Sequence, residues 1–146
     1  MYRKIFVLAL VLSFPFASFG ADVFNPEREA LVLRVELNRL GSSGDPFERE
    51  ALLRKIIDRA PGTEEGEAAY WDLADLYLDG FPEEMRQEAQ EMLELCLRAY
   101  PNTRRSLLVK CRLVDLYDAK DSRRDELVKQ LQNDKTLPNM LRASLK

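Results

Sequence analysis

Aspartates and glutamates are the residues in this sequence whose type and spacing could do chemistry. Asp72, Asp75 and Asp79 are separated by three and four residues, which places them on one face of a helix. Such a face attracts cations, but it lacks the looped cage of oxygen atoms that calcium prefers. Paired-carboxylate catalysis, for which Glu67 or Glu94 would be candidates, needs two groups in different environments around a cleft. The spacing therefore predicts no catalytic residue, no metal site and no cofactor.

Histidine is absent from all 146 residues. Its absence removes the commonest general base, the commonest metal ligand and every nucleophile pair that depends on an imidazole. The chain also has no glycine-rich phosphate loop, no GxSxG and no CxxC. We therefore expect a protein that is not an enzyme, with a carboxylate-dependent enzyme or enzyme subunit of the cell envelope as the alternative.

The first 21 residues have the layout of a secretory signal peptide. Arg3 and Lys4 precede an apolar run from Ile5 to Leu12, and small residues follow around Ala17–Ala21. The run is short for a bilayer crossing of about 20 residues, which disfavours an uncleaved anchor. No cysteine lies near the cleavage region, so lipid attachment is not expected. We predict an exported protein, periplasmic in preference to secreted, without stable membrane insertion after cleavage.

The rest of the chain, residues 22–146, predicts a single all-α domain. Its 125 residues are close to the commonest domain size. Removing Arg3 and Lys4 changes the net charge from −3 to −5, which argues against a nucleic-acid partner. Apolar residues recur at helical spacing between clusters of turn residues. The pattern predicts about seven helices, near 26–40, 46–60, 64–79, 83–99, 104–118, 123–134 and 138–145.

Two similar turns, APGT at Ala60–Thr63 and YPNT at Tyr100–Thr103, are separated by 40 residues. The same offset relates residues along the flanking helices. The matching pairs are Leu53 and Leu93, Ile57 and Leu97, Leu73 and Leu113, Asp75 and Asp115, Leu76 and Leu116, and Tyr77 and Tyr117. Because one helical hairpin cannot bury its own apolar face, this repeat predicts hairpins stacked on one another.

The turn residues indicate how each hairpin joins the next. Proline disfavours helical geometry in the residue before it and so ends a helix. Gly62 and Asn102 tolerate a positive φ, and Thr63 and Thr103 can cap the following helix through their hydroxyls. Three residues later neither Glu nor Gln is present, so only a simple cap is expected. The repeated turns are therefore predicted to be the seams between hairpins.

The centre of the chain, 47–117, resembles the tetratricopeptide repeat (TPR). The residues that carry the resemblance are Tyr70, Leu73, Ala74 and Tyr77 on one helix, and Ala89, Leu93, Cys96 and Pro101 on the next. The turns are longer than in the usual unit of about 34 residues. In this respect the chain is similar to TPR proteins of the Gram-negative periplasm. The resemblance implies a right-handed helical-hairpin solenoid of about three repeats with a C-terminal capping helix. It also implies close helix contact at Ala74 and Ala89.

In that family the first helix of each hairpin lines a concave groove that binds a protein or peptide. By this register the groove-facing residues would be Asn38, Arg39, Trp71, Asp75, Leu78, Asp79, Leu108, Cys111, Asp115 and Asp118. Four aspartates among them favour a partner with Lys or Arg, with a merely solvated helix face as the alternative. Trp71 would be either an anchor for the partner or a packing residue between hairpins. The implied function is that of an adapter or scaffold in cell-envelope assembly or maintenance; a self-associating spacer is a further alternative.

Cys96 and Cys111 lie on either side of the Pro101 turn, at similar heights in antiparallel helices. Two cysteines in an exported protein can form a disulfide. Helices in contact, however, have axes about 8–10 Å apart, whereas a disulfide needs Cα atoms within about 7 Å. The sequence favours Cys96 as a small packing residue and leaves the pairing open.

Overall fold

The structure, a computed structural model, describes residues 25–81, 85–138 and 142, and in this part the chain forms helices and no strands. The helices are α1 (Pro26–Leu40), α2 (Pro46–Arg59), α3 (Glu64–Asp75), α4 (Arg86–Ala99), α5 (Arg104–Leu116) and α6 (Ser122–Asn133), with a π-helical turn η1 (Leu76–Gly80) that continues α3. The all-α prediction is confirmed, and so are the first six predicted helices. The predicted signal peptide at 1–21 and most of the predicted helix at 138–145 fall outside the described residues.

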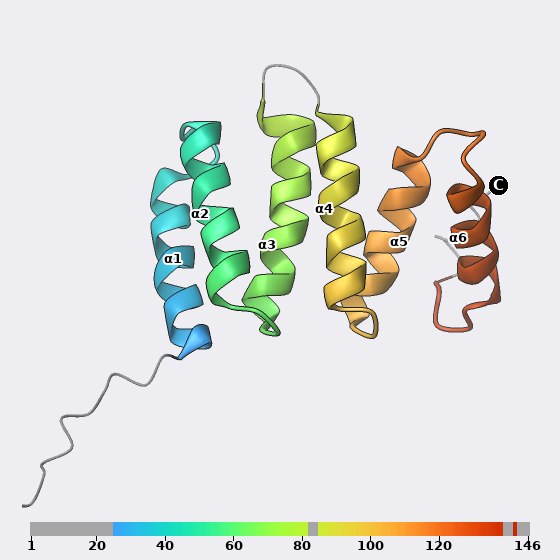
Figure 1. Ribbon diagram of the computed structural model, residues 1–146, viewed down its shortest axis with the longest axis horizontal. Helices are drawn as coiled ribbons and strands as arrows, with labels where there is room; N and C mark the ends of the chain where they lie inside the picture. Colours follow the sequence, from blue (N-terminus) through green and yellow to red (C-terminus); the bar gives the residue numbers. More distant parts are fainter. Residues whose placement is uncertain (1–24, 82–84, 139–141, 143–146) are drawn as a thin grey trace, which may run out of the picture.

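Consecutive helices run antiparallel and lie side by side in chain order, with α1 at one end of the row and α6 at the other (Figure 1). Each helix packs against the next one in the chain, and α1 also contacts α3. Each pair of neighbouring helices in the described part of the chain therefore forms an antiparallel helical hairpin. One apolar cluster extends from α1 to α5, and a smaller one, Val114, Leu131 and Leu137, joins α5 to α6.

Small residues occupy the contact between α3 and α4. Ala69 and Ala74 on α3 and Ala89 on α4 are all buried, with at most 1% of their surface exposed. Side chains this small let two helix backbones approach closely, as the sequence predicted for Ala74 and Ala89. Leu73 and Leu93 fill the remaining space in the same cluster.

Threonine hydroxyls cap α3 and α5 as predicted. Thr63 Oγ1 accepts from the Gly66 N–H at 3.1 Å, and Thr103 Oγ1 accepts from the Ser106 N–H at 3.2 Å. Gly62 adopts a positive φ of 77°. Asn102 does not adopt a positive φ. Among the described residues only Gly41 and Gly62 do. The two turns therefore share their caps but not their backbone conformation.

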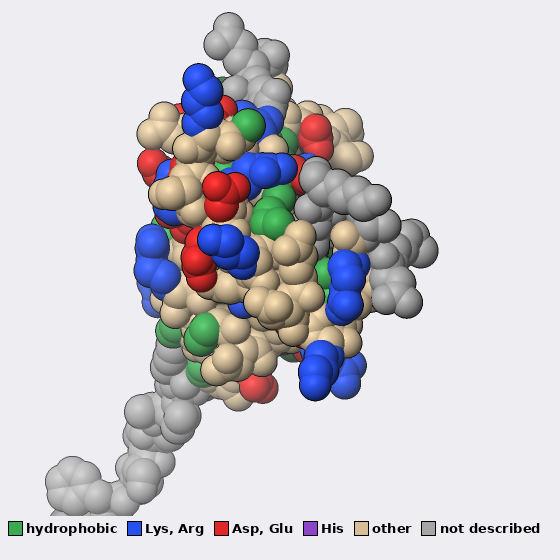
Figure 2. Space-filling model, turned by 90° about the vertical axis from the view of Figure 1, so that its right-hand side faces the viewer, with side chains coloured by type: hydrophobic (Ala, Val, Ile, Leu, Met, Phe, Trp, Pro, Cys, Tyr) green, Lys and Arg blue, Asp and Glu red, His purple; other side chains and the backbone are tan. Residues whose placement is uncertain are grey.

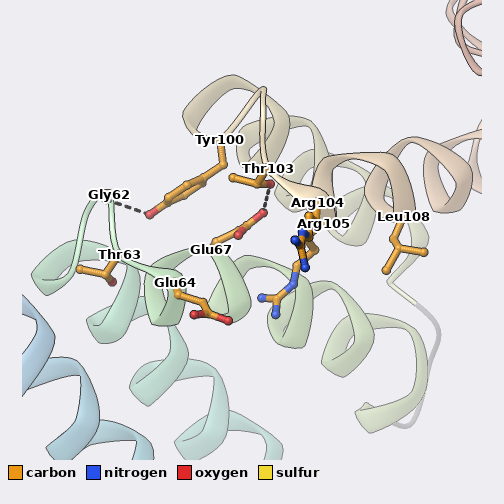
Figure 3. A pocket seen from close by; sticks show the side chains of 9 residues that line it. All are labelled: Gly62, Thr63, Glu64, Glu67, Tyr100, Thr103, Arg104, Arg105 and Leu108. Atoms are coloured by element: carbon orange, nitrogen blue, oxygen red, sulfur yellow. Dashed lines mark hydrogen bonds between the residues drawn. The ribbon is translucent and has the colours of Figure 1, made fainter. Parts of the chain in front are cut away.

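The two repeated turns are bonded to each other (Figure 3). The Gly62 N–H donates to Tyr100 Oη at 2.9 Å, and the Thr103 hydroxyl donates to the carboxylate of Glu67. A Cβ at Gly66 would lie 2.3 Å from the Ala60 carbonyl oxygen and 2.7 Å from Tyr100 Oη. The absence of a side chain at Gly66 is therefore what lets Tyr100 reach the first turn.

Tyrosine hydroxyls join the two segments on either side of each repeated turn. Tyr77 Oη donates to Glu50 of α2 at 2.6 Å, and 40 residues later Tyr117 Oη donates to Glu94 of α4 at 2.9 Å. Burial, together with the hydrogen bond to a carboxylate, raises the pKa of both tyrosines to about 12. Both phenols consequently stay protonated and donate throughout the physiological range.

Replacing Gly66 by alanine tests the packing of the seam. Alanine has the higher helix propensity, but its Cβ would collide with Ala60 and Tyr100. We expect Gly66→Ala to lower the free energy of unfolding by about 1–3 kcal/mol, measured by urea denaturation followed by circular dichroism.

The matched control is Ser106→Ala, the corresponding position 40 residues later. It removes only the bond from Ser106 Oγ to the Thr103 carbonyl, at 2.7 Å, and should cost about 1 kcal/mol or less. A Gly66→Ala protein as stable as the parent would show that the seam tolerates a side chain.

Candidate functional site

A groove lies between α3 and α5 at the face opposite α4. Trp71, Asp75 and Asp79 follow one another at four-residue intervals along α3 and η1. On α5, Leu108, Cys111, Arg112 and Asp115 share one face at spacings of three, four and seven. These seven residues, which we call the acidic groove, line a depression of about 380 Å³. Six of the ten residues predicted from the sequence are among them.

A second depression of about 540 Å³ continues the acidic groove toward α1. Asp75 and Asp79 line both depressions, and the predicted residue Asn38 lines the second. Arg34 of α1 forms an ion pair with Asp72 of α3 there. The Arg34 guanidinium thus fills the position where the repeat has a small residue, and it links the first hairpin to the second.

Asp75 is the most perturbed carboxylate of the acidic groove. Burial raises its pKa above the ordinary value, and the neighbouring charges of Asp72 and Asp79 add to this effect. The charge of Arg112 and a hydrogen bond from Trp71 act in the opposite direction without cancelling it. The Arg112 Nη2 atom lies 3.8 Å from Asp75 Oδ1, which is a loose ion pair. The ionised form of Asp75 is therefore incompletely compensated.

Trp71 contributes to both the core and the groove. Its side chain is half-buried and packs against the main apolar cluster. Another part of it lines the acidic groove beside Asp75. The sequence left two roles open for Trp71, an anchor for a partner and a packing residue. One side chain in this position can fill both roles.

Three of the predicted residues lie elsewhere. Arg39 is on the outer face of α1, beside Val32 and Val35, away from the acidic groove. Leu78 is half-buried and packs against the main cluster. Its position lies within the π turn, where the wider turn changes the register expected for an α-helix. Asp118 is exposed beyond the end of α5.

Arg112 is the residue of the acidic groove that the sequence analysis missed. It lies four residues after Leu108 and three before Asp115, so helical spacing could have placed it on the same face. Its Nε atom is buried and has no hydrogen-bond partner within the described part of the chain. The side chain therefore retains an unused donor next to the groove.

Both cysteines are free thiols. Cys96 is buried in the main cluster, as predicted for a packing residue, and burial raises its pKa to about 11. Cys111 is half-buried on the acidic groove, and burial raises the pKa of its thiol as well. Neither thiol is therefore activated as a nucleophile.

Among the described helices none is long and apolar enough to cross a bilayer. Within the same residues, no three acidic or cysteine side chains converge in a way that could hold a metal ion. Comparison of the chain with protein-family models, with curated proteins and with solved structures finds no match. The likeness to TPR proteins accordingly rests on the residues named above.

Neutralising Asp75 tests the electrostatics of the acidic groove. A carboxyl whose pKa is raised by folding destabilises the folded state when ionised, and this cost disappears as the pH falls and the group is protonated. We expect Asp75→Asn to raise Tm at pH 7. The gain should shrink toward zero as the pH falls below about 3.8, where the carboxyl is protonated in both states.

The control for this prediction is Asp115→Asn. Asp115 is exposed on the same groove, so its substitution should leave Tm close to that of the parent at pH 7. A lower Tm for Asp75→Asn at pH 7 would mean that the ion pair with Arg112 outweighs the burial of the carboxylate.

Proposed function

We propose that this protein is an exported TPR-like adapter that binds a partner protein or peptide rich in Lys or Arg in its acidic groove. The observation that carries the proposal is the convergence of Trp71, Asp75 and Asp79 with Leu108 and Asp115 on one depression. We further propose that residues 22–146 form a right-handed solenoid of about three TPR-like hairpins, closed by a C-terminal capping helix. The antiparallel helices stacked in chain order support this reading.

The charge of the acidic groove determines the chemistry of the partner. Its lining carries three carboxylates, Asp75, Asp79 and Asp115, against the single guanidinium of Arg112. A Lys or Arg side chain of the partner would compensate the buried charge of Asp75, so binding would remove a cost that the free protein carries. The partner would therefore gain most from a cation placed near Asp75.

Apolar surface in the same groove suits the stem of such a side chain. Leu108 is 48% exposed, and part of the Trp71 side chain faces it across the depression. Long basic side chains bury their methylene groups on surfaces of this kind and keep the charged head beside a carboxylate.

Binding without catalysis is also favoured by what the two candidate acids do. Glu67 is only 6% exposed and accepts from Thr103 across the seam. Glu94 accepts from Tyr117 and pairs with Arg123 at 2.9 Å. Both carboxylates thus hold helices together, and we propose no chemical step for them.

The proposed place of action is the cell envelope, in its assembly or maintenance, because the N-terminal sequence has the layout of a signal peptide. We expect cross-linking in the native envelope, followed by mass spectrometry, to recover proteins linked through basic segments. Reversing two exposed groove charges, Asp79→Lys with Asp115→Lys, should reduce this recovery about tenfold or more while the helical circular dichroism is retained.

The matched control reverses two exposed charges on α6, Asp125→Lys with Glu126→Lys, and should leave recovery unchanged. The total charge change is the same, so non-specific electrostatics affects both proteins equally. Equal recovery from the groove variant and the parent would refute the groove assignment. Hydrolysis of envelope glycan by the purified parent would instead favour the enzyme alternative.

A further inference from the structure

Three apolar side chains are exposed on the outer face of α1, which no other helix of the described residues covers. Leu31, Val32 and Val35 are 54%, 62% and 54% exposed. The opposite face of α1 supplies Ala30, Leu33 and Leu37 to the main cluster. A helix that ends a row of stacked helices is expected to present polar residues outward. The apolar face of α1 therefore indicates that something packs on it.

The other end of the row has the expected character. All the exposed residues of α6 are polar or charged, namely Ser122, Arg123, Asp125, Glu126, Lys129, Gln130, Gln132 and Asn133. Figure 2, which views this end, shows acidic and basic side chains spread across it. An apolar face of a second molecule would meet polar and charged side chains on α6. End-to-end stacking of α1 on α6 is thus disfavoured.

The outer face of α1 has the shape that receives another helix. Val32, Val35, Glu36 and Arg39 surround a shallow depression of about 310 Å³. Their spacing of three, four and seven residues is that of the four-residue hole into which a side chain of a facing helix inserts. The surface is therefore suited to a helix rather than to an extended chain.

The charges on this face are complementary to a copy of themselves. Arg28 and Glu36 are exposed, and each is four residues from Val32, in opposite directions. Within the part of the chain that the structure describes, neither side chain forms an ion pair. An antiparallel copy centred on Val32 would place Arg28 opposite Glu36 twice. A parallel copy would instead oppose like charges.

We propose that α1 pairs antiparallel with α1 of a second copy of this chain to form a two-fold symmetric dimer. The same face serves both subunits, so the assembly closes at two copies. One helix face is smaller than the about 800 Å² per partner of a standard interface, so a weak, concentration-dependent dimer is expected. The dimer goes beyond the proposed function: the acidic groove lies between α3 and α5, so both copies would keep it open.

A charge swap tests the pairing directly. The protein is produced from the whole chain, and mass spectrometry establishes its N-terminus. Sedimentation equilibrium then gives its molecular mass between about 5 and 500 μM, a range wide enough to detect a weak dimer. Arg28→Glu alone and Glu36→Arg alone should each weaken the dimer about tenfold, because each creates two repulsive contacts per dimer. The double variant should restore the parent constant within about threefold.

Two further variants complete the test. Val32→Asp should abolish the dimer, since it puts two like charges opposite each other at the centre of the contact. Glu126→Arg on α6 changes the net charge exactly as Glu36→Arg does and should leave the dimer intact. A parent that stays monomeric at about 500 μM, in which another segment could cover α1, overturns the proposal. So does a double variant that fails to restore association, because the antiparallel register requires it.

Discussion

Close contact between α3 and α4 is the constraint on which the rest of the array depends. Ala69 and Ala74 on one helix and Ala89 on the other are fully buried, so larger side chains there would push the helices apart. Near the start of α3, Gly66 leaves room for the Ala60 carbonyl at the end of α2 and for the hydroxyl of Tyr100. Tyr100 follows α4 directly, and its hydroxyl accepts from the Gly62 N–H in the turn before α3, so this contact links the end of α4 to the start of α3. The walls of the acidic groove are therefore positioned by residues that do not line it.

A hydrogen bond from a tyrosine to a glutamate occurs in both 40-residue units, but the glutamate stands at a different position in each. Tyr77 finds a carboxylate at Glu50, with Arg54 bonded to both. In the next repeat Tyr117 finds its carboxylate at Glu94, the position that corresponds to Arg54. A phenol can satisfy its buried donor with an acceptor in either place, since the two positions are one helical turn apart. The repeat therefore preserves a satisfied tyrosine rather than a fixed pair of residues.

Local patterns in the sequence were sufficient to predict the first six helices and the threonine caps. Each depends on a few neighbouring residues, as when Thr63 accepts from the N–H three residues ahead. Contacts between distant residues were not predictable in this way. Arg34 and Asp72 are 38 residues apart, and only the packing of α1 against α3 brings them together. The π turn at Leu76–Gly80 was likewise not predicted, and Leu78, which lies within it, packs against the core instead of lining the groove.

A partly buried carboxylate such as Asp75 is costly to keep in a protein that has no use for it. Asparagine at the same position would fill the same space without charge, and the loose contact with Arg112 does not offset the burial. A solvated helix face, the alternative reading of these aspartates, would hold its charges in the open, as α6 does. Asp75 instead lies where two depressions meet, beside Trp71 and opposite α5. A cation brought by a partner would remove the cost at that position, and this difference between the free and the occupied groove is the physical argument behind the binding proposed for it.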